Sequence, residues 1–440
     1  MFKRKIASLI EDYLRGPREK ILVIKGARQI GKSFIVRETS KKTYPHYVEV
    51  NLQADFDGPR LFSAENIRTT SSFYLQLSAL YGDDLGTRDD TVVFLDEIQV
   101  YPHLLTLFKA LQADRRFTYI ASGSLLGVTL KHTFIPMGAI DEVAMYPMDF
   151  EEFLWANHVG EEAISHVKDC FANLRPVEPA LHDFFLSRFR EFVLCGGLPD
   201  AVKALVEQKN VVAMRKVHAD TYAYYKDDAT KYDRQNKLKI ERIYSLMASY
   251  MENKVKRIPV SQIEKDVRRT FDHYQDEFDY LVSSGIALAV KAVSDPRFPL
   301  VESSAKNLVK LYYNDVGILT NILYKTNINA VLNLDKGPNL GSAYETVAAM
   351  ELIAHGHDLY YFDSKKVGEV DFLTNDYDSL SVLPIEIKSG NDQNNFRAIP
   401  KLVDPEGNYR LPKGYVFGNK NIVSKTGHLI TLPIYMIMFL

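Results

Sequence analysis

The hydrophobic positions in the first half of the chain form short apolar runs separated by amphipathic stretches. Residues 21–24 (ILVI), 91–95 (TVVFL) and 117–121 (FTYIA) are such runs, and residues 104–114 (LLTLFKALQAD) are amphipathic. Short apolar runs are typical of strands that are buried on both faces of a parallel sheet, and amphipathic stretches are typical of the helices that cover it. The pattern therefore predicts an α/β fold with a parallel sheet.

The middle of the chain has a mostly helical pattern. Three helical stretches, followed by two strand-like runs, lie at 236–250, 261–267, 271–285, 286–293 and 307–314. Three helices and a β-hairpin form the order of a winged helix, which suggests DNA binding. The third stretch, however, contains no Lys or Arg and carries Asp272, Asp276, Glu277 and Asp279. Because DNA phosphates would repel these carboxylates, we expect this region to pack within the protein or to contact a protein partner, with DNA binding as the alternative.

The last part of the chain returns to mixed helix and strand. A helix is expected at 341–356, and strands at 359–364, 369–375 and 381–390. We therefore expect an α/β protein of three units: a parallel-sheet unit at 1–195, a helical and winged-helix region at 196–330, and an α/β domain at 331–440.

Composition limits the class of protein. A chain of 440 residues is too long for one hydrophobic core, and 46% hydrophobic residues are enough for several. The net charge of −2 argues against general attraction to nucleic acid, and two cysteines exclude a disulfide framework. The apolar C-terminal run at 429–440 is too short to cross a membrane, and Glu11 and Asp12 interrupt the N-terminal one. We expect a soluble, cytoplasmic protein.

A phosphate-binding motif follows the first apolar run. It matches G-x-x-x-x-G-K-[ST] and consists of Gly26, Ala27, Arg28, Gln29, Ile30, Gly31, Lys32 and Ser33. The glycines allow backbone N–H groups to approach phosphate closely, Lys32 supplies a positive charge to the β and γ oxygens, and Ser33 offers a hydroxyl to Mg²⁺. A chance glycine-rich turn is the alternative, but the strand before the motif and the helical pattern after it favour an ATP and Mg²⁺ site.

Acidic and hydroxyl side chains end the next two predicted strands. Asp96 and Glu97 close one apolar run, and Ser122 and Ser124 close the following one. The carboxyl ends of parallel strands are where such sheets bind ligands. We expect Asp96 to hold Mg²⁺ and Glu97 to activate the attacking water, with helix capping as the alternative. Either serine could sense the γ-phosphate, or could simply bond to its own turn.

The C-terminal part carries a second group of charged side chains on neighbouring elements. Glu345 lies on the inner side of the predicted helix, Asp371 lies on one strand, and Glu386 and Lys388 lie on the next. Residues two apart on a strand point to the same side, so Glu386 and Lys388 share a face with room for Asp371. A metal site is one interpretation, and a buried ion-pair network is the other.

The motifs GARQIGKS, VVFLDEIQ, ASGS, YPMDFEEFL and GGLPDAV together resemble a prokaryotic family of AAA-type ATPases related to the archaeal and STAND classes. The resemblance spans nearly the whole chain. It implies a winged-helix region after the ATPase and a C-terminal domain with a restriction-endonuclease-like fold. It also implies that Pro199 approaches the nucleotide. In that family's pattern Asp371 and Glu386 would bind Mg²⁺, Lys388 would activate water, and Glu345 would assist.

We therefore expect an ATPase whose nucleotide state controls a nuclease-like domain. Mg²⁺-dependent DNA cleavage is one hypothesis, and an ATP-dependent switch or scaffold with an inactive domain is the other. Residues 331–440 carry 10 Lys and Arg against 13 Asp and Glu, which does not favour broad duplex binding. Arg115 and Arg116 are candidates for an arginine finger, and the alternatives of a monomer and a homo-oligomer stay open.

Overall fold

The computed structural model describes residues 2–51, 58–124, 138–232, 237–252, 256–264, 269–325, 327–332, 340–390 and 397–440. The chain divides into two compact units. The N-terminal unit contains Met1–Tyr146 and Ser283–Gly285, and the C-terminal unit contains Pro147–Val282 and Ile286–Leu440. This division into two units differs from the expected three units with boundaries at 195 and 330, which stay a prediction. The first unit ends directly after its last strand, and the middle and last regions fold together.

The N-terminal unit is built on a five-stranded sheet whose strands are all parallel. The strand order is β2 (His46–Asn51), β3 (Thr91–Asp96), β4 (Thr118–Gly123), β1 (Ile21–Lys25) and β5 (Ile140–Ala144). Its helices are α1 (Lys5–Arg15), α2 (Lys32–Thr43), α3 (Gly58–Leu61), α4 (Thr70–Tyr81) and α5 (Phe108–Asp114), with 3₁₀ turns η1 (Gly82–Asp84), η2 (Ile98–Val100) and η3 (Pro102–Leu107). The predicted parallel-sheet α/β fold is confirmed for this unit.

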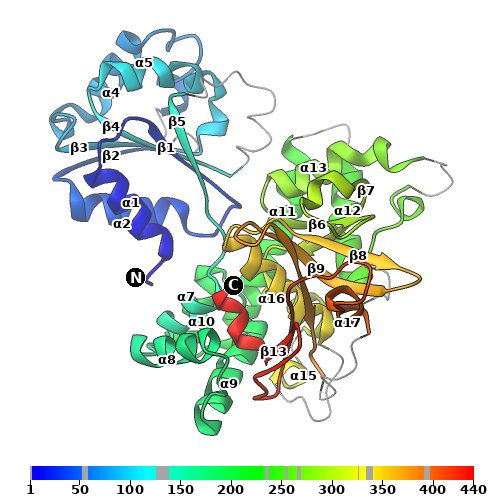
Figure 1. Cartoon of the computed structure of the whole chain (residues 1–440). Helices are drawn as coiled ribbons and strands as arrows, with labels where there is room; N and C mark the ends of the chain where they lie inside the picture. The colour runs from blue at the N-terminus through cyan, green and yellow to red at the C-terminus, as the bar shows by residue number, and fades with distance from the viewer. Residues whose placement is uncertain are drawn as a thin grey trace. The chain divides into compact units, whose positions relative to one another are not determined.

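The two faces of this sheet are covered by different helices. Figure 1 shows α1 and α2 on one face and α4 and α5 on the other. Alternate strand residues such as Val93 and Leu95 pack in one buried cluster with Phe73 of α4 and Phe108 of α5. Because both faces are covered, the strands are apolar at nearly every position, which is why the sequence shows continuous runs rather than alternation.

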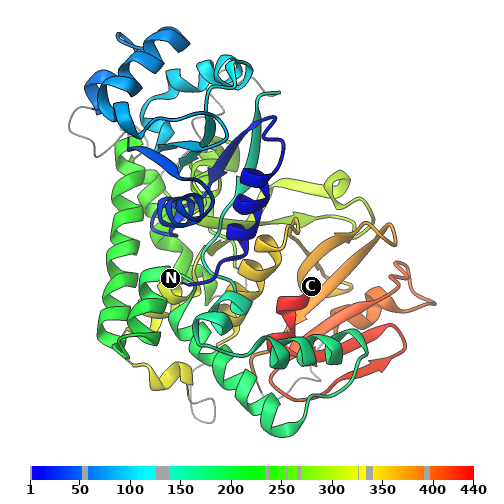
Figure 2. The ribbon, with the colours of Figure 1, turned by 90° about the vertical axis from the view of Figure 1, so that its left-hand side faces the viewer.

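The C-terminal unit begins with a set of helices. They are α7 (Phe150–Ala156), α8 (Glu161–Ala172), α9 (Pro179–Cys195), α10 (Pro199–Val206), α11 (Val211–Tyr232), α12 (Lys237–Met251) and α13 (Gln275–Ser283). Further on come α14 (Val316–Tyr324), α15 (Asn329–Leu332), α16 (Gly341–Ala354) and α17 (Ala398–Val403), and 3₁₀ turns η4 (Val260–Gln262), η5 (Phe271–Tyr274), η6 (Leu300–Ser303) and η7 (Ile434–Phe439). Figure 2 shows α11 as the long green helix, and α12 and α14 pack against it.

A mixed eight-stranded sheet completes this unit. Its order is β12 (Ser424–Thr426), β13 (Leu429–Pro433), β11 (Gly414–Gly418), β10 (Ser381–Ile387), β9 (Gly368–Asp376), β8 (Tyr360–Ser364), β6 (Ala287–Val293) and β7 (Ser304–Tyr313). Strands β8, β9 and β10 are antiparallel neighbours, and β11 runs parallel to β10. Helix α16 packs on β6, β7 and β10, and α17 packs on β9, β10 and β13.

The expected winged helix differs from the structure in two respects. The hairpin of β6 and β7 is present, but β6 pairs in parallel with β8, so the hairpin belongs to the large sheet. The described part of the second expected helix, at 261–267, contains only the 3₁₀ turn η4, and residues 265–268 lie outside the described residues. The pairing partner of β6 lies far along the chain, which local sequence patterns do not reveal.

The Gly196–Gly197 pair has a packing role inside the C-terminal unit. A side chain on Gly196 would meet the Asp315 carboxylate at 2.2 Å, and one on Gly197 would meet the Met148 carbonyl oxygen at 2.0 Å. The Gly197 N–H donates to Asp315 at 2.6 Å. Asp315 is fully buried, and burial raises its pKa to about 6 despite these backbone hydrogen bonds. The glycines therefore allow a buried carboxylate to sit against the backbone.

No helix among the described ranges is both long enough and apolar enough to cross a membrane. The apolar C-terminal run at 429–440 forms two elements: β13 ends at Pro433, and η7 follows it.

Candidate functional site

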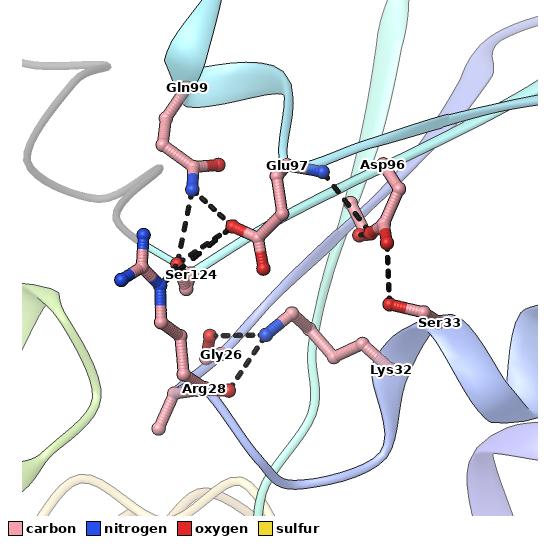
Figure 3. A network of polar contacts seen from close by, with 10 residues as sticks. Gly26, Arg28, Lys32, Ser33, Asp96, Glu97, Gln99 and Ser124 are labelled. Atoms are coloured by element: carbon pink, nitrogen blue, oxygen red, sulfur yellow. Dashed lines mark hydrogen bonds and ion pairs between the residues drawn. The ribbon is translucent and has the colours of Figure 1, made fainter. Parts of the chain in front are cut away.

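The phosphate-binding motif forms the connection between β1 and α2. Gly26 and Gly31 have φ values of 157° and 91°, and a side chain on Gly26 would lie 2.2 Å from the Met145 carbonyl oxygen. Glycine is therefore required for both the turn and the close approach. Lys32 opens α2, and its Nζ donates to the carbonyl oxygens of Gly26 at 3.0 Å and Ala27 at 2.7 Å (Figure 3). The loop thus curls around the lysine ammonium.

Burial places Lys32 in an unusual electrostatic environment. Its side chain is buried, and desolvation lowers its pKa to about 8, although the nearby Glu97 and Asp96 carboxylates act in the opposite direction. An anionic phosphate group beside the ammonium would favour its charged form. The structure therefore presents a desolvated cation at the position where the motif requires one.

Asp96 lies at the carboxyl end of β3 and joins three elements. Ser33 at the start of α2 donates to Asp96 Oδ2 at 2.7 Å, and Ser122 of β4 donates to Asp96 Oδ1. Burial raises the pKa of Asp96, and the two serine hydrogen bonds oppose that rise. Because β4 lies between β1 and β3, Ser122 reaches the carboxylate from the neighbouring strand.

Glu97 follows Asp96 in a tight turn. Its φ of 54° is in the left-handed region, which few residues other than glycine adopt, and the chain turns there from β3 into η2. Its Oε2 accepts hydrogen bonds from Ser124 Oγ at 3.0 Å and from Gln99 Nε2. Arg28 Nε donates to the same Ser124 hydroxyl at 2.8 Å and lies 3.9 Å from Glu97 Oε2 (Figure 3).

The charged cluster of the C-terminal unit is assembled around β9, β10 and α16. Asp371 accepts from the Ile387 N–H at 2.9 Å, and Lys388 donates to Glu386 at 2.7 Å. Glu345 of α16 is paired with Lys256 and accepts from the Tyr312 hydroxyl at 3.0 Å.

These carboxylates are close enough to influence one another. Burial raises the pKa of Asp371 well above its ordinary value, Glu386 and Glu345 raise it further, and Lys256 opposes the rise. The pKa of Glu386 is also raised by burial, against the effect of Lys388. Even so, in the part of the chain that the structure describes, no three His, Cys, Asp or Glu side chains are grouped so that they could hold a metal ion. In this structure Glu345 pairs with Lys256, and Glu386 pairs with Lys388.

Comparison with protein families gives matches to three parts of the chain. An AAA domain family matches residues 18–154. Residues 186–329 match a domain of unknown function, DUF8612, and residues 340–437 match another, DUF4143. No curated protein shows significant similarity to the chain.

The family match to residues 18–154 covers β1, the phosphate-binding loop and β3, where the geometry places Lys32, Ser33, Asp96 and Glu97 together. The N-terminal unit is an AAA-type P-loop ATPase domain.

Solved structures resemble the chain only distantly. The Walker-type ATPase paby2304 of Pyrococcus abyssi is 13% identical, with a TM-score of 0.41, covering 73% of this chain and 95% of that one. The Hsp104–ADP complex of S. cerevisiae is 10% identical, with a TM-score of 0.29, covering 64% and 38%. The RuvB Holliday junction branch migration motor of Thermotoga maritima is 14% identical, with a TM-score of 0.28, covering 65% and 89%. These scores are low, so the ATPase domain is assigned from the family match and the geometry.

The structure brings most of the predicted residues of the ATPase domain to one edge of the sheet. Ser122 contacts Asp96, whereas Ser124 contacts Glu97, so the two serines have different partners. Gln99 was not predicted. A glutamine two residues after the acidic pair becomes a candidate only when the left-handed turn at Glu97 is known.

Some expectations stay predictions. Pro199 is the first residue of α10 in the C-terminal unit, so its predicted approach to the nucleotide is not tested within the ATPase domain. Arg116 lies with its guanidinium 4.6 Å from the centre of the Tyr74 ring, and Arg115 ends α5 in a left-handed conformation with a φ of 50°. That Arg115 or Arg116 acts as an arginine finger remains a prediction.

Proposed function

We propose that the chain binds and hydrolyses ATP at the edge of the sheet formed by β1, β3 and β4. The observation that carries this proposal is that Lys32 and Ser33, at the start of α2, lie beside the acidic pair Asp96 and Glu97, at the end of β3. A catalytic pocket needs this combination of a phosphate cradle, a metal-ligand pair and a base.

Two oxygen-bearing side chains of this site, Ser33 and Asp96, are suitable ligands for Mg²⁺. A Ser33 hydroxyl and an Asp96 carboxylate in contact form an all-oxygen donor set, which Mg²⁺ uses together with phosphate oxygens and water. When bound, the ion would supply positive charge that neutralises the phosphate oxygens. Ser33 and Asp96 are therefore the residues that would hold it.

The remaining residues have distinct roles in this mechanism. Lys32 and the loop N–H groups bind and orient the β and γ phosphates. Glu97 accepts a proton from water while the water oxygen bonds to the γ-phosphorus. The bond from that phosphorus to the bridging oxygen breaks, which releases ADP and phosphate.

A direct test is phosphate release by the full-length protein with ATP and Mg²⁺. Lys32→Ala should abolish tight ATP binding and turnover, because the other cation of the loop, Arg28, donates to Ser124 and lies beside Glu97. Lys109→Ala is a matched control, since Lys109 is an exposed residue of α5 in the same domain. Turnover at the parental rate by Lys32→Ala would show that the nucleotide site lies elsewhere.

The nucleotide state of the ATPase domain is proposed to control the C-terminal unit. Phosphate-dependent ordering of loops is a common way in which such domains transmit a change. In this proposal the C-terminal unit is the output of an ATP-dependent switch or scaffold. The exposed carboxylates Asp272 of η5 and Asp276 of α13 then serve a protein partner rather than DNA.

The charge network supports the switch over a nuclease. Lys256 and Lys388 already neutralise Glu345 and Glu386, so the carboxylates have cationic partners without a metal. One observation favours the nuclease as second candidate: Glu386 Oε2 is buried and has no hydrogen-bond partner among the described residues. Such an atom is a natural ligand position.

Plasmid cleavage separates the two candidates. Supercoiled plasmid is incubated with the protein and Mg²⁺ or Mn²⁺, with and without ATP, beside Asp371→Asn. The switch predicts intact plasmid throughout. Metal-dependent nicking that disappears in Asp371→Asn would instead establish the nuclease and leave the ATPase proposal unaffected.

A further inference from the structure

The Glu97 carboxylate is held on one side only. Every hydrogen bond that it accepts from the described residues ends on Oε2, where Ser124 and Gln99 donate and where Arg28 lies closest. Figure 3 shows its other oxygen pointing away from these groups, toward the side on which Lys32 lies. That oxygen faces the place where the γ-phosphate and its attacking water would be.

We propose that Gln99 is a positioning residue for ATP hydrolysis, which holds Glu97 Oε2 so that Oε1 is presented to the attacking water. This inference rests on the proposed function and adds to it a residue that acts through the base. In this proposal Gln99 acts through its hydrogen bond to Glu97.

The orientation of the glutamine amide follows from its neighbours. A carboxylate only accepts hydrogen bonds, so the NH₂ group of Gln99 must face Glu97, since the carbonyl oxygen there would place two acceptors in contact. The same Nε2 also donates to Ser124 Oγ at 3.1 Å. The donor group is therefore fixed by two partners.

The other end of the amide indicates why glutamine is there. Gln99 is 8% exposed, and its Oε1 is buried without a hydrogen-bond partner among the described residues. A buried acceptor without a partner disfavours folding, so a glutamine selected only for packing would be expected to have its oxygen satisfied. The contact of its NH₂ group with Glu97 explains its presence.

Ser124 and Arg28 brace the same arrangement. Ser124 lies after β4 and receives hydrogen bonds from Gln99 Nε2 and from Arg28 Nε while donating to Glu97. These hydrogen bonds thus connect the end of β4, the turn after β3 and the phosphate-binding loop. Catalytic geometry of this kind is lost when the reacting group shifts by about 1 Å.

The test variant is Gln99→Met, which keeps the length of the side chain and removes both polar atoms. We expect kcat to fall about 10- to 100-fold, with the ATP dissociation constant within about threefold of the parental value. The melting temperature without nucleotide should not fall, because the unpaired buried oxygen is removed as well. Gln112→Met is the matched control, since Gln112, in the same domain, donates to the backbone carbonyl of Glu19 and has no side-chain partner among the residues that the structure describes.

A double-variant cycle shows whether Gln99 acts through Glu97. In a Glu97→Gln background, Gln99→Met should change single-turnover hydrolysis by less than about twofold, because the base that it positions is already absent. The inference would be overturned if Gln99→Met slowed hydrolysis by the same factor in both backgrounds, or if its kcat were parental. It would also be overturned if lower stability explained the fall in kcat. An inactive parent protein would contradict the proposed function itself, which distinguishes the two failures.

Discussion

Removing the Lys256 ammonium should destabilise the C-terminal unit strongly. Lys256 pairs with Glu345 of α16, and the side chains are 15% and 8% exposed. Taking away one partner of a buried pair leaves an uncompensated charge and costs about 3–5 kcal/mol. Because Asp371 also loses a nearby cation, we expect Lys256→Met to lower the free energy of unfolding by an amount within this range.

The assay uses the only tryptophan of the chain. Trp155 lies in α7 of the C-terminal unit, so its fluorescence during urea unfolding reports on that unit. Lys216→Met is the matched control: Lys216 pairs with Asp220 at 2.6 Å, but the two side chains are 73% and 61% exposed. Such a surface pair one helical turn apart is worth only about 0.3–0.5 kcal/mol.

The pH dependence gives a second check on the same variant. Lys256 lowers the pKa of Asp371, so its removal raises that pKa further above the unfolded value. Because the pKa of Asp371 is higher in the folded state than in the unfolded state, protonation of Asp371 stabilises the fold. This stabilisation is lost as the pH rises. The loss of unfolding free energy caused by Lys256→Met should therefore be larger at about pH 8 than at about pH 5. A deficit equal to that of Lys216→Met, or one independent of pH, would refute the role of Lys256 as counter-ion.

Three further outcomes are expected for the C-terminal unit. Gly197→Ala should cost about 1–3 kcal/mol by urea unfolding, because its new methyl group meets the Met148 carbonyl, whereas Gly160→Ala, with open space at that position, should cost less. The pKa of Asp315 rises from 3.8 to about 6, so about 3 kcal/mol of stability present below pH 3.8 is lost as the pH rises through 6, and Asp315→Asn should flatten this dependence. Added Mg²⁺ should leave the parental unfolding midpoint of Trp155 fluorescence unchanged, and a clear rise would favour the metal site.

The residues of the proposed ATP site could be identified from the sequence because their signals are local. Gly26 to Ser33 lie within one short loop, and their spacing reflects the geometry of a strand, a turn and a helix. The carboxyl edge of the sheet then gathers Asp96, Ser122 and Ser124 by the general rule for parallel strands. Gln99 was not predicted, because its contact with Glu97 depends on a left-handed turn at Glu97, a residue that is not glycine.

The C-terminal unit was harder to predict because its decisive contacts are distant in sequence. Lys256 and Glu345 are 89 residues apart, and neither belongs to a recognisable motif with the other. The β6–β7 hairpin has the sequence pattern of a wing, yet its pairing with β8 places it in a larger sheet. Local patterns predicted the helix, the strands, the acidic positions and Lys388, whereas Lys256, the partner of Glu345, came only from tertiary structure.

Nucleotide binding and turnover by Glu97→Gln test the central claim most directly. The amide keeps the size of the side chain but cannot accept the proton from water, so the variant should bind ATP with parental affinity and hydrolyse it at least about 100-fold more slowly. Stable retention of radiolabelled ATP on the variant, with conversion to ADP on the parent, is the predicted result. Hydrolysis by Glu97→Gln at the parental rate, or binding and turnover weakened to the same extent, would contradict the assignment of Glu97 as the base.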